Sequence, residues 1–379
     1  MRDVTAARRI GLVLGGGGLK GFAHIGVLRA LEERGIRPAA LAGTSIGALI
    51  AAAFTGGMSL DEMARRAESL RRRDLFRLNH VGMLLERMRS PSIYLEAPLR
   101  ALCESVCPRG RFDDLTIPLL VNTVDVERGT QVVWGLPGLR DVPVADAVYA
   151  SCALPGFFPP GRVDGRTCID GGTVDNLPVS AAALGGAAGA AGGGRALDAL
   201  IAVDVGSGEL AHDTAIAEQG FASIYMRAAT TMMHALQEAP LTHWSGPPML
   251  LIRPRLAQVS WFSFGHTAEV IHEGYRAARE ALETLDEVLA APGGVFPRRS
   301  VHLTVDEARC TGCGLCVSLA PRVMGLDARR KAFALTQVAE WSPADGDFVR
   351  HCPTDAIAVH RIERRSTGVT ISPDEETAA

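Results

Sequence analysis

A serine flanked by glycines joins two apolar runs early in the chain, in the stretch Gly43-Thr44-Ser45-Ile46-Gly47. Residues 39–42 before it predict the end of a short buried strand, and residues 46–54 after it predict a helix. A sharp turn from strand to helix needs the backbone freedom of glycine and exposes the serine hydroxyl. The positive end of the helix then faces the place where negative charge develops during acyl transfer. Taken alone, the motif fits both a catalytic nucleophile and an ordinary tight turn.

The segment before this turn has the same order of strand, glycine loop and helix. Residues 9–14 form a compact apolar run that predicts a strand, and residues 15–21 are rich in glycine. Residues 22–31 then place apolar side chains mainly on one helical face. A glycine run leaves backbone N–H groups free to converge on an oxyanion, so beside an exposed serine it would form an oxyanion hole.

Two nucleotide-binding alternatives use the same glycine loop. Its glycines satisfy the dinucleotide-binding spacing G-x-G-x-x-G at Gly16, Gly18 and Gly21. That site needs an acidic residue after the second strand, where Ser45 and its neighbours stand instead. A P-loop needs glycine before Lys20 and serine or threonine after it, and the sequence has neither. Both nucleotide sites therefore fit the sequence poorly.

The region from residue 60 to residue 102 mixes arginines with apolar side chains in a helical pattern. Arginines stand at Arg71, Arg72, Arg73 and Arg77. We interpret the region as amphipathic helices with a solvated basic face. The alternative is a basic cap, rich in methionine and leucine, that contacts anionic lipid head groups.

A carboxylate before two glycines follows much later, in Asp170-Gly171-Gly172. The preceding residues 168–169 predict a short strand that runs into a tight turn. Aspartate before glycine is often only a turn former.

Composition limits the class of protein. The chain has 379 residues, of which 47% are hydrophobic, so two or three domains can each bury a core. The formal net charge of −3 argues against a nucleic-acid binder that relies on bulk electrostatics. No apolar run reaches the roughly 18 residues of a spanning helix, and the N-terminal residues do not resemble a signal peptide. We therefore expect a cytoplasmic protein.

Cysteines mark a separate C-terminal site. Three of the eight follow the spacing C-x₂-C-x₂-C at Cys310, Cys313 and Cys316, and Cys352 stands before a proline. Three thiolates on one tight loop and a remote fourth can ligate the irons of one [4Fe–4S] cluster. Zinc is the alternative, although zinc sites usually pair two C-x₂-C knuckles. The remaining cysteines are interpreted as packing or free thiols: Cys103, Cys107, Cys152 and Cys168.

Together the N-terminal motifs resemble the patatin-like phospholipases, especially the bacterial group related to neuropathy target esterase. The resemblance spans residues 8–290 and implies a three-layer α/β/α hydrolase domain with a mainly parallel sheet. It implies a Ser-Asp dyad in which Ser45 is the nucleophile and Asp170 activates it. It assigns the oxyanion hole to Gly16, Gly17 and Gly18. It also implies supporting roles for Lys20, Gly21, Gly43, Gly47, Gly171 and Gly172.

The C-terminal sequence is similar to small single-cluster ferredoxins, over about residues 300–362. This resemblance implies a small α+β domain with one [4Fe–4S] cluster. The expected organisation is a hydrolase domain at 1–290, a linker at 291–299, a ferredoxin-like domain at 300–365 and a disordered tail at 366–379.

The resemblance to the patatin-like phospholipases implies hydrolysis of a carboxylic ester in a phospholipid or lysophospholipid, at a peripheral membrane contact. One alternative is a histidine-dependent triad, which places its histidine late in the domain, where His266 and His272 are available. His24, the histidine nearest to the motifs, is interpreted as a packed helix residue. Another alternative is a redox or electron-transfer module with its own redox partner, in which the hydrolase fold serves as a scaffold. A third is an esterase or thioesterase acting on a soluble acyl compound.

Overall fold

The computed structural model describes residues 8–79, 92–188, 196–206, 218, 220–256, 258–336, 338–345, 348–365 and 368–373. These residues form two compact units. The larger unit extends to Gly293, except that Glu238–Ser245 group with the smaller unit, which begins at Gly294. None of the described helices is both long and apolar enough to cross a bilayer.

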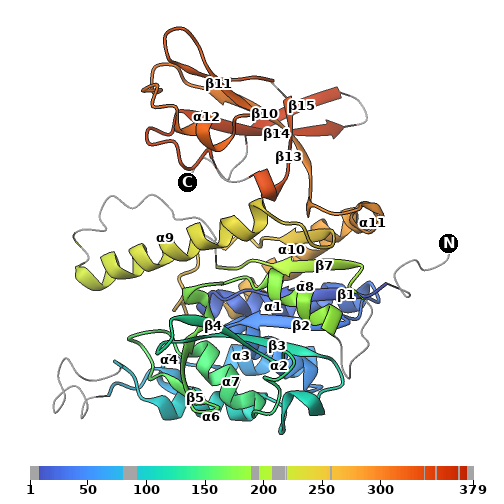
Figure 1. The fold of residues 1–379 in the computed structure, drawn as a ribbon, viewed down its shortest axis with the longest axis vertical. Helices are drawn as coiled ribbons and strands as arrows, with labels where there is room; N and C mark the ends of the chain where they lie inside the picture. The colour runs from blue at the N-terminus through green and yellow to red at the C-terminus, as the bar shows by residue number, and fades with distance from the viewer. Residues whose placement is uncertain are drawn as a thin grey trace. The chain divides into compact units, whose positions relative to one another are not determined.

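The larger unit is built on one sheet with the strand order β5-β6-β3-β2-β1-β7-β8, and β4 pairs with β3 (Figure 1). The strands are β1 (Ile10–Leu14), β2 (Ala40–Thr44), β3 (Leu119–Asp125), β4 (Thr130–Trp134), β5 (Gly161–Val163), β6 (Arg166–Asp170), β7 (Ala199–Val203) and β8 (Met249–Ile252). The neighbours from β3 to β8 are parallel, whereas β4 and β6 run antiparallel to β3. The prediction of an α/β fold with a mainly parallel sheet is confirmed.

Helices lie on both sides of this sheet (Figure 1). They are α1 (Ala23–Glu33), α2 (Ile46–Thr55), α3 (Leu60–Ser69), α4 (Arg72–Leu75), α6 (Glu96–Val106), α7 (Val144–Cys152), α8 (Val179–Ala188), α9 (Phe221–Thr242), α10 (Thr267–Ala281) and α11 (Leu285–Ala290). Short 3₁₀ turns follow at η1 (Gly18–Phe22), η3 (Phe112–Asp114), η4 (Gly171–Thr173) and η6 (Leu282–Thr284). Because both faces are covered, the central strands β1, β2 and β7 are buried along their whole length.

Two glycines let α1 and α10 pack closely. A Cβ atom on Gly26 would overlap the Ile271 carbonyl oxygen, and one on Gly274 would overlap the Ala23 carbonyl oxygen. These obstacles are backbone atoms, so a side chain cannot be accommodated by a change of rotamer. Glycine at both positions therefore sets the approach of the two helices.

Gly26→Ala should lower the free energy of unfolding by about 1–3 kcal/mol, the usual cost of overpacking a core. Thermal unfolding of the full chain measures this loss. Gly293→Ala is the matched control, because its Cβ would meet its nearest neighbour at an ordinary 3.6 Å. Equal unfolding temperatures for the two variants would contradict the account of this helix contact.

The smaller unit contains an antiparallel sheet in the order β13-β10-β14-β15 and a separate hairpin of β11 and β12. Its elements are β9 (Val295–Phe296), β10 (Arg299–Val305), α12 (Leu315–Leu319), β11 (Met324–Leu326), β12 (Ala332–Ala334), β13 (Val338–Trp341), η7 (Pro343–Asp345), β14 (Ile357–Arg365) and β15 (Gly368–Pro373). Its core joins apolar side chains such as Leu303, Met324 and Phe348 to two of the motif cysteines, Cys310 and Cys316.

One prediction at the C-terminus needs correction. Residues 366–379 were expected to be a disordered tail, but Gly368–Pro373 forms β15 and pairs antiparallel with β14. In residues 368–372, Val369 and Ile371 alternate with glycine or polar residues, which is the pattern of a strand. The prediction of a disordered tail relied instead on the polar and acidic composition of the whole segment. The residues after 373 lie outside the described part of the chain.

Candidate active site

Ser45 lies at the sharp turn between β2 and α2. Its φ of 54° and ψ of −125° place a non-glycine residue in a strained region, at a cost of order 1–3 kcal/mol. A Cβ on Gly47 would overlap the Leu14 carbonyl oxygen, and one on Gly43 would stand 2.6 Å from the Ala48 nitrogen. The two flanking glycines are therefore required by close backbone contacts on either side of the serine.

A buried serine supports this turn from another element. Ser151, on α7, accepts a hydrogen bond from the backbone N–H of Ser45 at 2.8 Å and donates one to the Asn122 carbonyl at 2.7 Å. Sequence reasoning missed this role, because residue 151 lies 106 positions away in the chain. We infer that Ser151 holds the strained backbone of Ser45 in place.

Asp170 is brought to Ser45 at the end of β6. The Ser45 hydroxyl donates a hydrogen bond to its carboxylate, and the N–H of Gly172 donates another to Oδ1 at 2.8 Å. Asp170 is only 5% exposed, and burial raises its pKa to about 6 in spite of these two hydrogen bonds. The carboxylate is thus a stronger base than a solvated aspartate and is still ionised at neutral pH.

The glycine loop is tied to three other segments. Gly15 donates its N–H to the Val203 carbonyl at 3.0 Å, and Leu19 donates to Trp261 at 2.9 Å. Gly16 lies beside Ser45, since a Cβ on it would stand 3.3 Å from the Ser45 Cβ. These bonds fix the loop next to Ser45.

One predicted oxyanion donor is committed elsewhere. The N–H of Gly16 donates to the Asn176 carbonyl at 3.2 Å, and the Asn176 side-chain amide donates to the Gly16 carbonyl at 3.1 Å. Within the described residues, the N–H groups of Gly17 and Gly18 have no backbone acceptor. Gly18 has a φ of 58°, and a Cβ there would stand 2.5 Å from the Trp261 carbonyl oxygen. Gly17 and Gly18, rather than all three glycines, are the available donors.

The histidines are placed for other roles. His24 is fully buried, and its Nε2 lies 2.8 Å from the Gly15 carbonyl oxygen. Burial lowers its pKa to about 4, so the neutral ring supports the glycine loop. His266 is exposed and pairs with Glu269 at 2.9 Å, and His272 is also exposed. Among the described residues, no histidine lines the pocket that contains Ser45.

Lys20 and the remaining motif residues lie around the same loop. Lys20 is 5% exposed, so its stem is packed inside the protein. A Cβ on Gly21 would overlap the side chain of Ile46, the residue directly after Ser45. Gly171 packs against Asn122, and a Cβ on Gly172 would stand 3.0 Å from the Met233 methyl of α9. The glycines at 21, 171 and 172 therefore make room for neighbours of Ser45 and Asp170.

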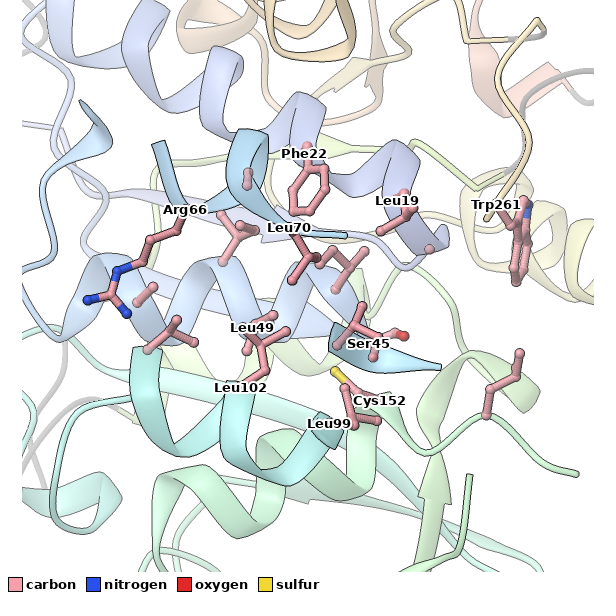
Figure 2. Close-up of a pocket in the computed structure, with 18 of the residues that line it drawn as sticks. Leu19, Phe22, Ser45, Leu49, Arg66, Leu70, Leu99, Leu102, Cys152 and Trp261 are labelled. Carbon is pink, nitrogen blue, oxygen red and sulfur yellow. The ribbon is translucent and has the colours of Figure 1, made fainter. Parts of the chain in front are cut away.

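Ser45 and Asp170 open into an apolar pocket with a volume of about 140 Å³. A comparable cavity lined by Leu, Ile and Phe holds an apolar molecule of about the size of benzene. One wall is a single face of α2, from Ser45 to Ala53, which corresponds to roughly 12 Å of helix. Figure 2 shows Ser45 and Arg66 well apart, with Leu49, Leu70 and Leu102 between them. The pocket is therefore a groove that runs from Ser45 and Asp170 along α2.

Cys152 also lines this pocket, on the end of α7. Its hydrogen bond with Cys103 and its burial raise the pKa of the thiol well above the ordinary value. Burial likewise raises the pKa of Cys107. These thiols are protonated at neutral pH, which agrees with their interpretation as packing residues.

In the smaller unit the four motif cysteines line one pocket. Ala332 donates its N–H to the Cys310 sulfur at 3.4 Å, and Ala356 donates to the Cys352 sulfur at 3.3 Å. Burial opposes ionisation of Cys352, but the N–H groups of Thr354 and Ala356 outweigh it and lower the pKa of this thiol. Shared placement and N–H donors to sulfur fit a thiolate-bound cluster. Over the described ranges, no three His, Cys, Asp or Glu side chains are placed to hold a single metal ion.

Two glycines between the motif cysteines are required by the conformation of the loop. Gly312 and Gly314 have φ values of 72° and 78°, which favour glycine. A Cβ on Gly312 would overlap the Arg330 carbonyl oxygen. The loop can therefore present three thiols over a short stretch only with glycine at these positions.

Two family descriptions match separate parts of the chain. Residues 12–183 match the patatin-like phospholipase family, and residues 303–359 match the 4Fe-4S single cluster domain. The patatin match includes Ser45 and Asp170, and the second match includes all four motif cysteines.

Curated relatives match the N-terminal part. An uncharacterised NTE family protein of Mycobacterium tuberculosis is 36% identical over 176 residues, which cover 46% of each chain. Lysophospholipase NTE1 of Mycosarcoma maydis is 33% identical over 206 residues, 52% of this chain and 10% of the relative. Human patatin-like phospholipase domain-containing protein 6 is 32% identical over 206 residues, 54% of this chain and 14% of the relative. The chain thus spans less than half the length of these relatives.

Solved structures are similar only at low identity. VipD from Legionella pneumophila has 15% identity and a TM-score of 0.43, with 73% of this chain and 67% of that chain covered. The type III effector ExoU has 14% identity and a TM-score of 0.35, with 75% and 54% covered.

Proposed function

We propose that this chain, which carries a patatin-like phospholipase domain with homologues in the NTE family and a 4Fe-4S single cluster domain, is a serine acyl hydrolase. Its substrate would be an acyl ester of a phospholipid or lysophospholipid. The observation that carries the proposal is the Ser45 hydroxyl bonded to buried Asp170 at the end of an apolar groove.

The dyad would act in two steps. Ser45 Oγ attacks the ester carbonyl carbon while Asp170 takes its proton, and the N–H groups of Gly17 and Gly18 stabilise the oxyanion. Asp170 then gives the proton to the leaving alcohol oxygen as the ester bond breaks, which leaves the acyl group on Ser45. Water attacks this acyl-enzyme, Asp170 accepts its proton, and the collapse of the second intermediate returns a proton to Ser45. The raised pKa of Asp170 suits both directions of proton transfer.

The groove along α2 would hold the acyl chain. Its lining is apolar from Ile46 to Ala53, and such a surface gains free energy when it excludes water from an alkyl chain. The scissile carbonyl would then lie at Ser45, where the groove meets the glycine loop. This placement favours an ester with a long apolar acyl chain over an ester with a short or polar one.

Release of fatty acid tests this substrate class. The full chain, purified without oxygen, should release fatty acid from phosphatidylcholine or lysophosphatidylcholine, and more slowly from a short-chain ester that stays monomeric. Shortening the acyl chain should reduce kcat/KM by a factor of about three to four per methylene, the ratio that about 0.8 kcal/mol of burial gives. Turnover of soluble esters or thioesters alone would contradict the lipid assignment and favour the esterase alternative.

The second site is proposed to hold one [4Fe–4S] cluster on Cys310, Cys313, Cys316 and Cys352. The cluster would supply one-electron chemistry, and the N–H donors of Ala332 and Ala356 would stabilise the reduced state by bonding to sulfur. The match to the single-cluster domain favours a redox role, with a redox partner, beside the hydrolase. The location proposed for the protein is the cytoplasm, with peripheral contact at a membrane.

Cys352→Ser should abolish stable cluster binding, because one iron loses its thiolate. Chemical analysis of the anaerobically reconstituted full chain should give about four irons and four sulfides per chain, and Cys352→Ser should give far less of both. Cys152→Ser is the control, since that thiol lines the other pocket and should leave the iron content unchanged. One zinc and no sulfide per chain would contradict the cluster assignment.

Regulation by the cluster is a separate question with its own test. Acyl release can be compared for the oxidised, reduced and cluster-free protein. Different rates would support control of hydrolysis by the redox state. Equal rates in all three states would reject it and leave the cluster an electron-transfer or structural role.

A further inference from the structure

A short segment of the pocket wall has two chemically different sides. Leu70, Leu75 and Phe76 line the pocket that contains the dyad. Between and beside them stand four arginines, all of them exposed: Arg71, Arg72, Arg73 and Arg77. We call these four the arginine ridge. The same stretch of backbone therefore gives apolar side chains to the groove and guanidinium groups to solvent.

Within the described part of the chain, the positive charge of the ridge is largely uncompensated. Among the described residues, the acidic partner of the ridge is Asp74, whose carboxylate lies 4.0 Å from Arg73 and caps the N–H of Arg71 at 2.9 Å. Arg73 is 88% exposed, so this pair is a weak one in water. Arg71 bonds to the carbonyl of Glu68 and Arg77 to that of Arg73, which orients both side chains without neutralising them.

Aromatic rings lie beside the ridge. The ring of Phe76 contacts Tyr94 at 4.9 Å, and other rings surround it at Phe158, Phe262 and Phe264. The guanidinium of Arg72 lies over the Phe76 ring, 5.7 Å from its centre. The ring cluster fixes the position of the segment, and arginine binds phosphate oxygens through two parallel N–H donors. The charge and the chemistry both suit an anionic lipid surface.

We propose that the arginine ridge docks the pocket on a bilayer of anionic phospholipids. The guanidinium groups bind lipid phosphates, and the groove lies beside the contact. The inference rests on the proposed function for the use of the groove by an acyl chain, but the binding itself requires no catalysis. Of the two interpretations of this region, the inference favours a basic face that contacts lipid head groups over a basic face that only contacts water.

Vesicle sedimentation tests this inference in the Ser45→Ala background, where the lipid is not consumed. Arg73→Gln with Arg77→Gln should weaken binding to phosphatidylcholine vesicles that contain phosphatidylglycerol by about 30-fold, the ratio that about 1 kcal/mol per basic residue gives. Vesicles of phosphatidylcholine alone should not distinguish the variants. Added salt should weaken binding of the Ser45→Ala protein with an intact ridge, because it screens exposed charges.

A matched control removes the same charge from another surface. Arg34 and Arg37 are exposed at the end of α1 and do not line the pocket. Arg34→Gln with Arg37→Gln should bind like the Ser45→Ala protein with an intact ridge. Equal weakening by both double variants would overturn the ridge in favour of net charge, and no weakening by either would overturn it outright. Failure of the proposed function would instead appear as absent fatty-acid release by protein that still binds vesicles through the ridge.

Discussion

Ser45→Ala should reduce kcat/KM for an acyl ester by a factor of at least 10⁴, to the background of the assay. Removing the nucleophile of a serine hydrolase leaves only binding and oxyanion stabilisation, so losses of this order are usual. The substitution also removes a donor to the buried Asp170 carboxylate. Hydrolysis of a chromogenic ester by the full chain measures the loss.

The matched control is Ser105→Ala, on an exposed position of α6 that does not line the pocket. It should retain the activity of the parent. Unchanged activity in Ser45→Ala would remove the nucleophile assignment. Loss of activity in both variants would show that the assay reports folding rather than chemistry.

Asp170→Asn should lower kcat/KM by about a thousandfold at pH 8, because an amide cannot take the Ser45 proton. Ionisation of the Asp170 carboxylate should also set the acid limb of the pH profile of kcat/KM for the parent protein. With its pKa at about 6, activity should be level above pH 6 and fall tenfold per pH unit below it. A pH profile of kcat/KM for the parent measures this limb. An acid limb centred near pH 4 would show that Asp170 is not the desolvated base described here.

The stability of the folded protein should fall over the pH range in which activity rises, because both depend on ionisation of Asp170. The pKa of Asp170 is raised from 3.8 in the unfolded chain to about 6 in the folded one, so the folded protein binds more protons between these values. Its stability therefore falls as the pH rises through this window, and the cost is complete above pH 6. Asp170→Asn should raise the free energy of unfolding by up to about 3 kcal/mol at pH 8 and leave it unchanged below pH 4. Thermal unfolding at both pH values measures this difference, and destabilisation by the substitution at pH 8 would contradict it.

The local elements could be predicted because each depends on neighbouring residues. The apolar run of β2, the glycines at 43 and 47 and the apolar run of α2 specify the turn at Ser45 within a few positions. The cysteine spacing likewise specifies a loop with three thiols facing one pocket. The mainly parallel sheet followed from the resemblance and is confirmed.

The contacts that tune the site could not be predicted, because they join residues far apart in the chain. The carbonyl of Asn176, 160 positions away in the chain, accepts a hydrogen bond from the N–H of Gly16. This contact leaves the N–H groups of Gly17 and Gly18 as the available donors. His24 was expected to be a packing residue, and the fold shows that its ring also meets the Gly15 carbonyl. Burial, which raises the pKa of Asp170, is likewise a property of the folded chain.

Covalent labelling of the chain decides whether Ser45 is the nucleophile. The full chain can be treated with a fluorophosphonate, which transfers phosphorus to an activated serine and releases fluoride, and its peptides can then be analysed by mass spectrometry. We expect a single adduct on Ser45 in the parent and none in Ser45→Ala. An adduct on another residue, or no adduct on a protein that hydrolyses esters, would contradict this assignment.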